Sequence, residues 1–403
     1  MTPASKRPLS ALLSQLLIAF TVELDNEFER RMSEAGYPGA HLSLVVWSNL
    51  VRFCANGEVT VRDLESRALA PRQRIQHELG CLERWRVVEL LPNQTNDQAT
   101  LISVSGRARR QLRVGWGSGR GIRADWIVRL TAKGIKSREI WPTLLNEIER
   151  RWEMRFGRDE ISRLRRSLEA VVDQLDIELP HGLPSGCQIA ANLPARNALG
   201  SSSLALPTLL SQLLLAFAIA FNRLSDAPLW LCANALRVLG KEPIPVGEIP
   251  HLTGGSPEQA GIGWQLKAYV VVEADPTKQR GKVVRLNPRG LKAQHAYYQL
   301  NSKIEEEWEQ RFGKDEIQRL RASLLALFDH RTGNEQSLAI GLIPLPGTVR
   351  AGAEVPSLGR REIGAAARQR RRNLIAQTEA YVRDPSRTLP HFPLWDMNRG
   401  FGP

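Results

Sequence analysis

One short segment of this 403-residue chain is rich in arginine and amide side chains. Their types and spacing suit hydrogen bonding to a partner. Arginine can form paired hydrogen bonds to guanine and glutamine to adenine, and the first turn of a helix is the part that typically reaches base edges in a groove. Five such side chains follow Pro71, namely Arg72, Gln73, Arg74, Gln76 and His77. We expect them to contact DNA. The alternative is a polar helix face that only meets solvent.

Further basic residues lie in stretches that carry few or no acids. Residues 107–123 hold six arginines, four glycines and no acid, which predicts a flexible cationic arm that enters a minor groove or follows phosphates. An extended surface loop with incidental charge is the alternative. The side chains expected to contact DNA here are Arg107, Arg109, Arg110, Arg113, Arg120 and Arg123. A shorter basic run, with Lys278, Arg280 and Lys282, is expected to touch the phosphate backbone.

The same composition argues against an enzyme, a cofactor and a metal site. The seven histidines are scattered, the four cysteines form no CxxC pair, and no phosphate-binding glycine loop with its lysine is present. The net charge of +13 favours a polyanionic partner such as nucleic acid. We expect a cytoplasmic, nucleoid-associated protein with no membrane contact, since no stretch reads as apolar enough to span a bilayer.

The elements that must position these residues occur twice along the chain. Residues 12–17 return as residues 209–214, and residues 152–161 return, with conservative changes, as residues 308–317. A glycine, Gly134 or Gly290, follows the last predicted strand in each copy. The offset between copies falls from 197 (12 to 209) to 156 (152 to 308), so copy two is 41 residues shorter internally. A repeat of this length indicates a duplicated domain.

Each copy predicts the same order of elements. In copy one we expect an opening amphipathic helix, a second helix over 42–55, a short helix over 61–68 capped by Thr60, and a fourth over 71–84. Strands over 87–91 and 126–130 follow, and then two long terminal helices that break at Gly157. This order is that of a winged helix-turn-helix. Copy two repeats it with helices over 209–224, 228–239 and 246–251, strands over 270–273 and 283–286, and terminal helices over 290–327.

Short motifs in this order resemble the multiple-antibiotic-resistance regulator (MarR) family of bacterial winged-helix transcription factors. The resemblance covers roughly residues 10–177 and 207–328. In copy one it rests on residues 61–64, Leu82-Glu83 before Val87-Val88, residues 130–134, and residues 156–160 with Leu164 and Leu168. Members of that family dimerise through their terminal helices and often bind small aromatic acids between the winged-helix and dimerisation regions.

The resemblance implies a mainly α fold with small β-wings, in which two winged helix-turn-helix domains in one chain form an intramolecular pseudo-dimer. Two independent domains on a linker are the alternative. It also implies a small aromatic effector. Trp47, Phe53 and Trp85 are candidates to line its pocket, although core packing is the commoner role of such aromatics. Cys54 and Cys81 are more simply interpreted as inert thiols than as oxidant sensors.

The predicted domains are copy one (residues 10–177), a linker (178–206), copy two (207–328) and a basic C-terminal extension (329–403). The helix of copy two that corresponds to 71–84 carries Glu258, Gly261 and Gly263 and lacks the basic pair, so we do not expect it to read bases. The extension is expected to be loop-like to about 359 and then a basic helix over 361–381, for which nucleic-acid contact, a solvated face and a partner contact remain open.

These observations predict a transcriptional regulator that binds double-stranded DNA through copy one. One alternative is a protein-interaction scaffold or a non-specific DNA-packaging protein, with a protein partner on copy two or the extension. Another is a small-molecule sensor with weak DNA affinity.

Overall fold

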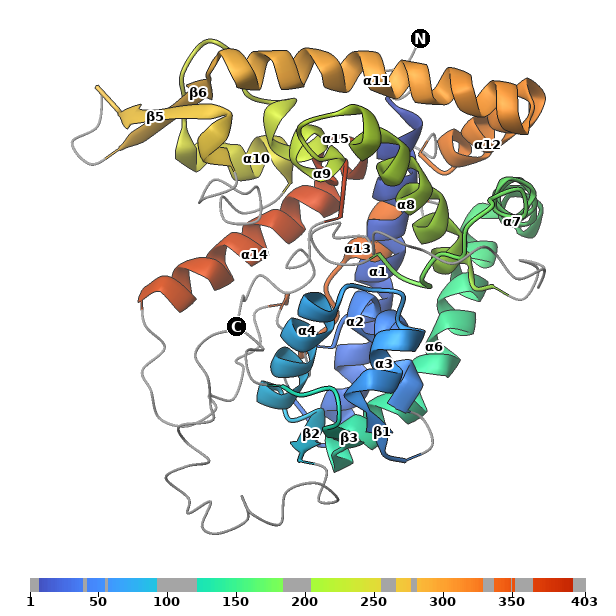
Figure 1. Ribbon diagram of the computed structural model, residues 1–403. Helices are drawn as coiled ribbons and strands as arrows, with labels where there is room; N and C mark the ends of the chain where they lie inside the picture. Colours follow the sequence, from blue (N-terminus) through green and yellow to red (C-terminus); the bar gives the residue numbers. More distant parts are fainter. Residues whose placement is uncertain are drawn as a thin grey trace.

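The computed structural model is mainly helical and contains two small antiparallel sheets, so the predicted fold class is confirmed at that level (Figure 1). It describes residues 7–38, 42–54, 57–92, 122–183, 204–254, 266–276, 281–328, 337–348, 350–351 and 365–393.

Copy one follows the predicted order of elements closely. Its helices are α1 (Leu9–Glu34), α2 (Leu44–Asn49), α3 (Val61–Arg67), α4 (Arg72–Arg84), α6 (Ala132–Phe156) and α7 (Arg158–Val172), and its strands are β1 (Val59–Thr60), β2 (Val88–Leu91) and β3 (Ile127–Leu130). The predicted cap is present, because the Thr60 hydroxyl accepts a hydrogen bond from the Asp63 amide at 3.1 Å. The helix expected over 42–55 is shorter, and it passes into a 3-10 turn at Val51–Cys54. Its β-branched and small polar residues favour helix weakly.

Copy two repeats this order with local changes. Its helices are α8 (Leu206–Leu224), α9 (Leu229–Leu231), α10 (Ile249–Thr253), α11 (Pro288–Phe312) and α12 (Lys314–Ala326), and its strands are β4 (Ile244–Pro245), β5 (Val270–Ala274) and β6 (Lys282–Leu286). The two sheets have the same strand order, β1-β3-β2 and β4-β6-β5. The helix expected over 228–239 is interrupted, because a π-helical turn at Cys232–Leu236 follows α9.

The two copies also match in individual helix breaks, caps and aromatic contacts. Gly157 and Gly313 separate the terminal helices with φ angles of 93° and 95°. Thr131 and Asn287 cap α6 and α11 by accepting from the amides of Gly134 and Gly290. Equivalent aromatic pairs join the opening and terminal helices, with ring centroids 5.2 Å apart for Phe20 and Trp152 and 5.3 Å apart for Phe217 and Trp308. The two copies therefore share one structural plan.

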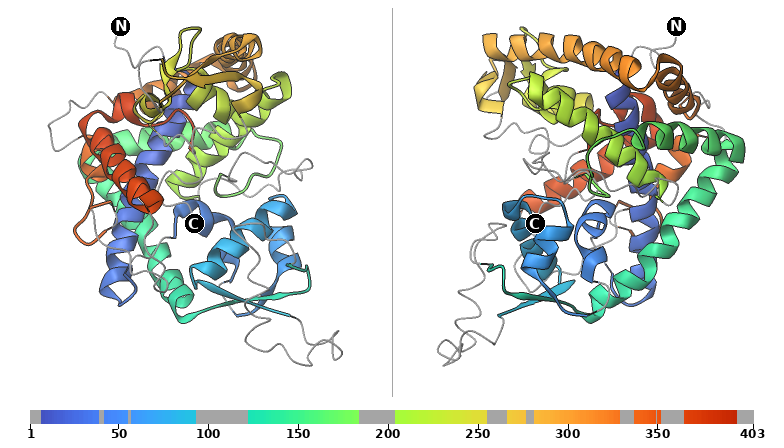
Figure 2. Two further views of the ribbon diagram at one scale, coloured as in Figure 1. Left: turned by 90° about the vertical axis from the view of Figure 1, so that its left-hand side faces the viewer. Right: turned by 45° about the vertical axis from the view of Figure 1, so that its right-hand side comes forward.

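The copies meet through their opening and terminal helices. α1 packs along α8, and α7 packs along α12. α7 and α12 lie at the right-hand side of Figure 1, away from both sheets (Figures 1 and 2). Polar bonds cross the contact: the Ser10 hydroxyl donates to the Asn301 Oδ1 at 2.9 Å, and the Leu9 amide donates to the Glu305 carboxylate at 2.7 Å. The apolar stripes of the opening helices are thus covered within the chain.

α1 and α8 are each long and apolar enough, by length and composition, to cross a membrane. The expectation that no stretch would reach that threshold is therefore wrong. In the folded chain these helices form the core, because the whole of the most apolar window of α1 and 78% of that of α8 are buried inside the protein.

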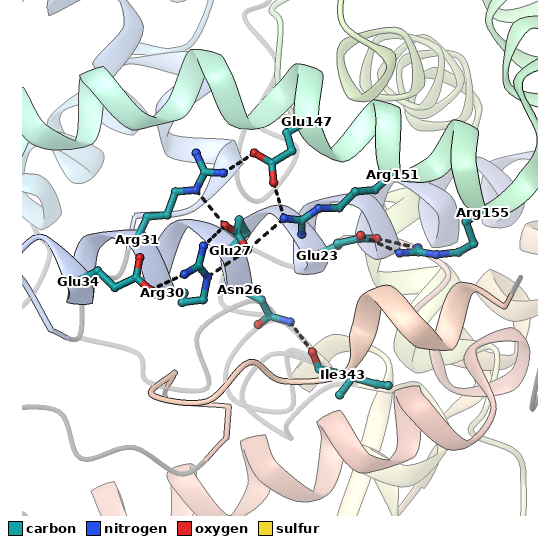
Figure 3. Close-up of polar contacts among 10 residues, drawn as sticks. All are labelled: Glu23, Asn26, Glu27, Arg30, Arg31, Glu34, Glu147, Arg151, Arg155 and Ile343. Carbon is teal, nitrogen blue, oxygen red and sulfur yellow. Dashed lines mark hydrogen bonds and ion pairs between the residues drawn. The ribbon is translucent and has the colours of Figure 1, made fainter. Parts of the chain in front are cut away.

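Buried acids of α1 are paired with arginines of α6 (Figure 3). Glu23 accepts two hydrogen bonds from the Arg155 guanidinium, both at 2.8 Å, and one from the Trp152 indole at 3.0 Å. Burial opposes ionisation of Glu27, but hydrogen bonds from Arg30 and Arg31 and the charge of Arg151 on α6 together outweigh it and lower the pKa of this carboxyl to about 2. The pairs of Glu23 with Arg155 and of Glu27 with Arg151 fix α6 to α1, the core helix of the molecule.

The C-terminal extension packs into the fold and contains α13 (Leu338–Leu342), α14 (Ala365–Arg383) and α15 (Pro385–Thr388). α13 lies against α1, and nearby the Arg350 guanidinium donates to the Asn26 Oδ1 at 2.8 Å. Beyond α15, Leu389 and Phe392 are fully buried. The expectation of a loop up to residue 359 therefore missed α13, whereas the predicted basic helix is present as α14.

Candidate nucleic-acid interface

The α3–α4 pair and the β2–β3 sheet form one lobe at the lower end of the molecule (Figure 1). Ile75, Leu79 and Leu82 of α4 are buried, as their helical spacing predicts. On the other side of the first turn, Arg72 and Gln73 are exposed to solvent. This arrangement presents the N-terminal end of α4 outward.

Arg72 and Gln73 are the two predicted readers on the outer face of α4. Both are exposed, and the Arg72 side chain retains 57% of its accessible surface. Its Nε lies 3.2 Å from a carboxylate oxygen of Glu65 on α3. An ion pair this exposed is worth little free energy, so the guanidinium is available to another partner.

Arg74 corrects the sequence prediction, because it faces the interior. Arg74 is 9% exposed, and Glu78, which lies one helical turn further along α4, is 2% exposed. The Arg74 Nε donates to the Glu78 Oε1 at 2.7 Å. Burial raises the pKa of the Glu78 carboxyl, whereas the charge and hydrogen bond of Arg74 act in the opposite direction. The helical period places position 74 on the same side as the buried Glu78 and Cys81, so this arginine lies inward and does not reach outward.

Gln76 and His77 also have partners within the protein. The Gln76 side-chain amide donates to the Ile122 carbonyl at 2.9 Å, which ties α4 to the chain that leads into β3. The His77 ring is half-buried, with its Nε2 3.9 Å from the Cys81 sulfur. Neither side chain matches the expectation of a free base-reading group.

The basic wing residues fall mainly outside the described part of the chain. Arg123 is described, and its guanidinium makes two bonds of 3.1 Å to the Asp125 carboxylate. Lys282 is exposed at the first position of β6. Residues that lie outside the described ranges are Arg107, Arg109, Arg110, Arg113, Arg120, Lys278 and Arg280, together with the copy-two segment 256–264.

No family model, curated protein or solved structure matches this chain.

A pocket opens between the copies and was not located from the sequence. Residues from α1, α2, α6, α8 and the start of the linker line it, including Leu17, Leu44, Leu145, His181 and Ser211. The Ser211 hydroxyl is buried and has no hydrogen-bond partner among the described residues. Burial, followed by the charge of Arg52, lowers the pKa of His181 to about 4, so its ring is neutral at physiological pH.

The aromatic residues expected at such a pocket lie elsewhere. Trp47 is buried and stacks on Trp141 with ring centroids 5.9 Å apart, Phe53 lies under the Arg52 guanidinium, and Trp85 packs against the core. Core packing, the commoner role, therefore holds for Trp47. Burial raises the pKa of the Cys54 thiol to about 12, which agrees with an inert thiol.

Proposed function

We propose that this protein is a DNA-binding transcriptional regulator in which the winged-helix lobe of copy one reads the duplex. The observation that carries the proposal is the exposed first turn of α4, where Arg72 and Gln73 project from a helix that is itself fixed by a buried apolar face. Arginine and glutamine at this point of a recognition helix suit direct contact with base edges.

The contact between the copies supports a pseudo-dimer as the framework. α1 against α8 and α7 against α12 is the arrangement expected when two subunits join through their opening and terminal helices. Such a framework would hold two lobes at a fixed separation, and dimeric readers place their half-sites about 10 base pairs apart.

The test uses a duplex selected from random sequence by the wild-type protein. Each lost paired contact should cost about 1–3 kcal/mol of discrimination, so we expect Arg72→Ala/Gln73→Ala to lower the preference over random duplex by at least about thirtyfold. The matched control is Gln318→Ala/Arg319→Ala, which removes the same two residue types from an exposed face of α12 and should change nothing. Titrations by fluorescence anisotropy at several salt concentrations measure both.

Two results would contradict this reading of the site. A wild-type protein that shows no preference over random duplex is not a sequence-dependent regulator. If the double variant instead loses affinity equally on every duplex, Arg72 and Gln73 contact phosphates and do not read bases.

The pocket favours a second candidate function, that of a small-molecule sensor. An apolar pocket with a few convergent polar groups is typical of ligand sites. A buried hydroxyl without a partner, as at Ser211, costs free energy that a ligand oxygen or nitrogen can recover. The resemblance makes small aromatic acids the first compounds to test.

We expect such a ligand to raise the melting temperature of the wild-type protein, because binding to the folded state alone stabilises it. Ser211→Ala should leave the ligand-free melting temperature nearly unchanged and weaken binding about fivefold, the value of one hydrogen bond of about 1 kcal/mol. Ser302→Ala, at an exposed position on α11, is the control and should bind as the wild type does. Equal affinity of Ser211→Ala and wild type would show that the ligand does not use this hydroxyl.

A further inference from the structure

The two lobes differ in the charge that they offer to a duplex. α4 of copy one carries Arg72 at its exposed end, whereas the corresponding copy-two segment has Glu258 and two glycines in place of the basic pair. A reader that spans two half-sites needs cationic groups at both, since phosphate neutralisation supplies much of the affinity. The copy-two helix does not provide the second group, which leaves that lobe with the short basic run of Lys278, Arg280 and Lys282.

α14 carries a dense group of positive charges. Four of the five residues 368–372 are arginine, and no acid occurs from 363 to 378. Arg372 is exposed. The helix has 19 residues and is therefore about 28 Å long at 1.5 Å per residue, most of one turn of duplex. Four of its five arginines lie in the N-terminal half, whereas the C-terminal half carries Glu379 and Arg383.

The C-terminal half of α14 is fixed to the helix-turn-helix lobe of copy two. The Tyr381 hydroxyl and the Gln377 amide both donate to the carbonyl oxygen of Gly254, which follows α10 directly and precedes the segment 255–265. Tyr381 and Thr378 are buried. Gly254 has a φ of 73°, and a Cβ at this position would overlap the Thr388 carbonyl oxygen. The fit at this joint is therefore close.

The segment after α14 is held by both copies. The Asn234 side chain of copy two donates to the Phe392 carbonyl at 2.8 Å and accepts from the Phe392 amide at 3.1 Å. From copy one, the Gln15 amide donates to the Leu389 carbonyl at 2.7 Å. These bonds are buried, so they fix the direction in which α14 leaves the core.

That direction leads to the side of the molecule where the lobes lie. In Figure 1, α14 runs from α15 toward the left, below the β5–β6 sheet and above α4, whereas α7 and α12 lie at the right. The left panel of Figure 2, which views that side, shows α14 at the left and the lobe that contains α4 at the lower right. The arginine-rich half is thus the end farther from the core.

We propose that α14 is the second DNA-contacting element of the protein and supplies, beside the copy-two lobe, the phosphate contacts that the copy-two helix lacks. This inference rests on the proposed function. It assigns double-stranded DNA as the partner of the C-terminal extension and makes the pseudo-dimer an asymmetric reader, with base contacts from α4 and backbone contacts from α14.

The experiment compares two quadruple variants on the selected duplex. Arg368→Gln/Arg370→Gln/Arg371→Gln/Arg372→Gln removes four charges from α14. Arg158→Gln/Arg163→Gln/Arg166→Gln/Arg319→Gln removes four exposed charges from α7 and α12. The α14 variant should flatten the slope of log affinity against log salt by about 3 and bind on the order of a hundredfold more weakly at low salt. The control should change the slope by less than about 1.

Hydroxyl-radical footprinting gives an independent readout. The α14 variant should keep protection where α4 binds and lose it one helical turn away, about 10 base pairs along. Gln377→Ala/Tyr381→Phe, which removes the bonds to Gly254 without changing charge, should weaken the same distal protection. Circular dichroism melts of each variant monitor folding.

The outcomes separate the two proposals. An α14 variant with the salt slope of the control and an intact distal footprint overturns the role of α14 and leaves the proposed function standing. A wild-type protein that binds no duplex overturns the proposed function, and the role of α14 with it.

Discussion

Replacing Arg74 by alanine should destabilise the protein by about 3–5 kcal/mol, the typical cost of leaving one partner of a buried ion pair without the other. Arg74 and Glu78 are both buried, and the carboxylate would lose the guanidinium that donates to it at 2.7 Å. Urea unfolding followed by circular dichroism measures the change.

Two controls isolate the pair from the helix that carries it. Arg72→Ala lies two residues earlier on the same helix but is exposed, so its effect should be within about 0.5 kcal/mol. The double variant Arg74→Met/Glu78→Leu replaces both charges by apolar groups of similar size and should recover most of the loss. A single variant Arg74→Ala as stable as Arg72→Ala would contradict the buried position of Arg74.

The loss should also depend on pH. In Arg74→Ala the burial of Glu78 remains and the arginine that lowers its pKa is gone, so this pKa should rise further above the ordinary value of 4.5. A folded state that binds a proton more tightly than the unfolded state loses stability as pH rises through that interval. Arg74→Ala should therefore be less damaging at pH 5 than at pH 8, whereas the wild type should show a smaller change.

Local signals predicted much of this fold. The Thr60 cap, the break at Gly157 and the periodic apolar stripes each depend on neighbouring residues, and the structure has all of them. Arg74 shows where a local interpretation was incomplete. The polarity of Arg74 indicated an outward face, but its spacing of four from Glu78 and of seven from the buried Cys81 places it inward. The helical period, applied to every residue of the segment, contains that signal.

No local sequence signal predicted where the C-terminal segment packs. Gln15 and Leu389 are 374 residues apart in sequence and bond through a buried amide and a carbonyl. Asn234 bonds Phe392 from within a π-helical turn that neither propensity nor periodicity indicates. The pocket likewise combines residues of both copies with His181 of the predicted linker. Such contacts depend on the folded arrangement of the two copies, which single-sequence patterns do not encode.

Gly134→Ala and Gly290→Ala should each destabilise the protein by about 3 kcal/mol or more, the upper range for an added carbon in a packed site. A Cβ at Gly134 would overlap the Val87 carbonyl oxygen and lie 3.1 Å from a Leu130 methyl carbon. At Gly290 it would overlap the Tyr269 carbonyl oxygen in the same way. The obstruction is backbone, so no side-chain rotation relieves it.

Gly80→Ala is the matched control, because Gly80 lies inside α4 and a Cβ there meets nothing within 4 Å. It should stabilise the protein by about 0.5–1 kcal/mol, since alanine favours helix over glycine. Urea and thermal unfolding measure all three variants. Similar losses at Gly134 and Gly290 are expected because each glycine lies where a long terminal helix follows the sheet of its own copy. If only one of the two changes is costly, the joint between wing and terminal helix differs between the copies, and the duplication seen in sequence does not extend to this joint.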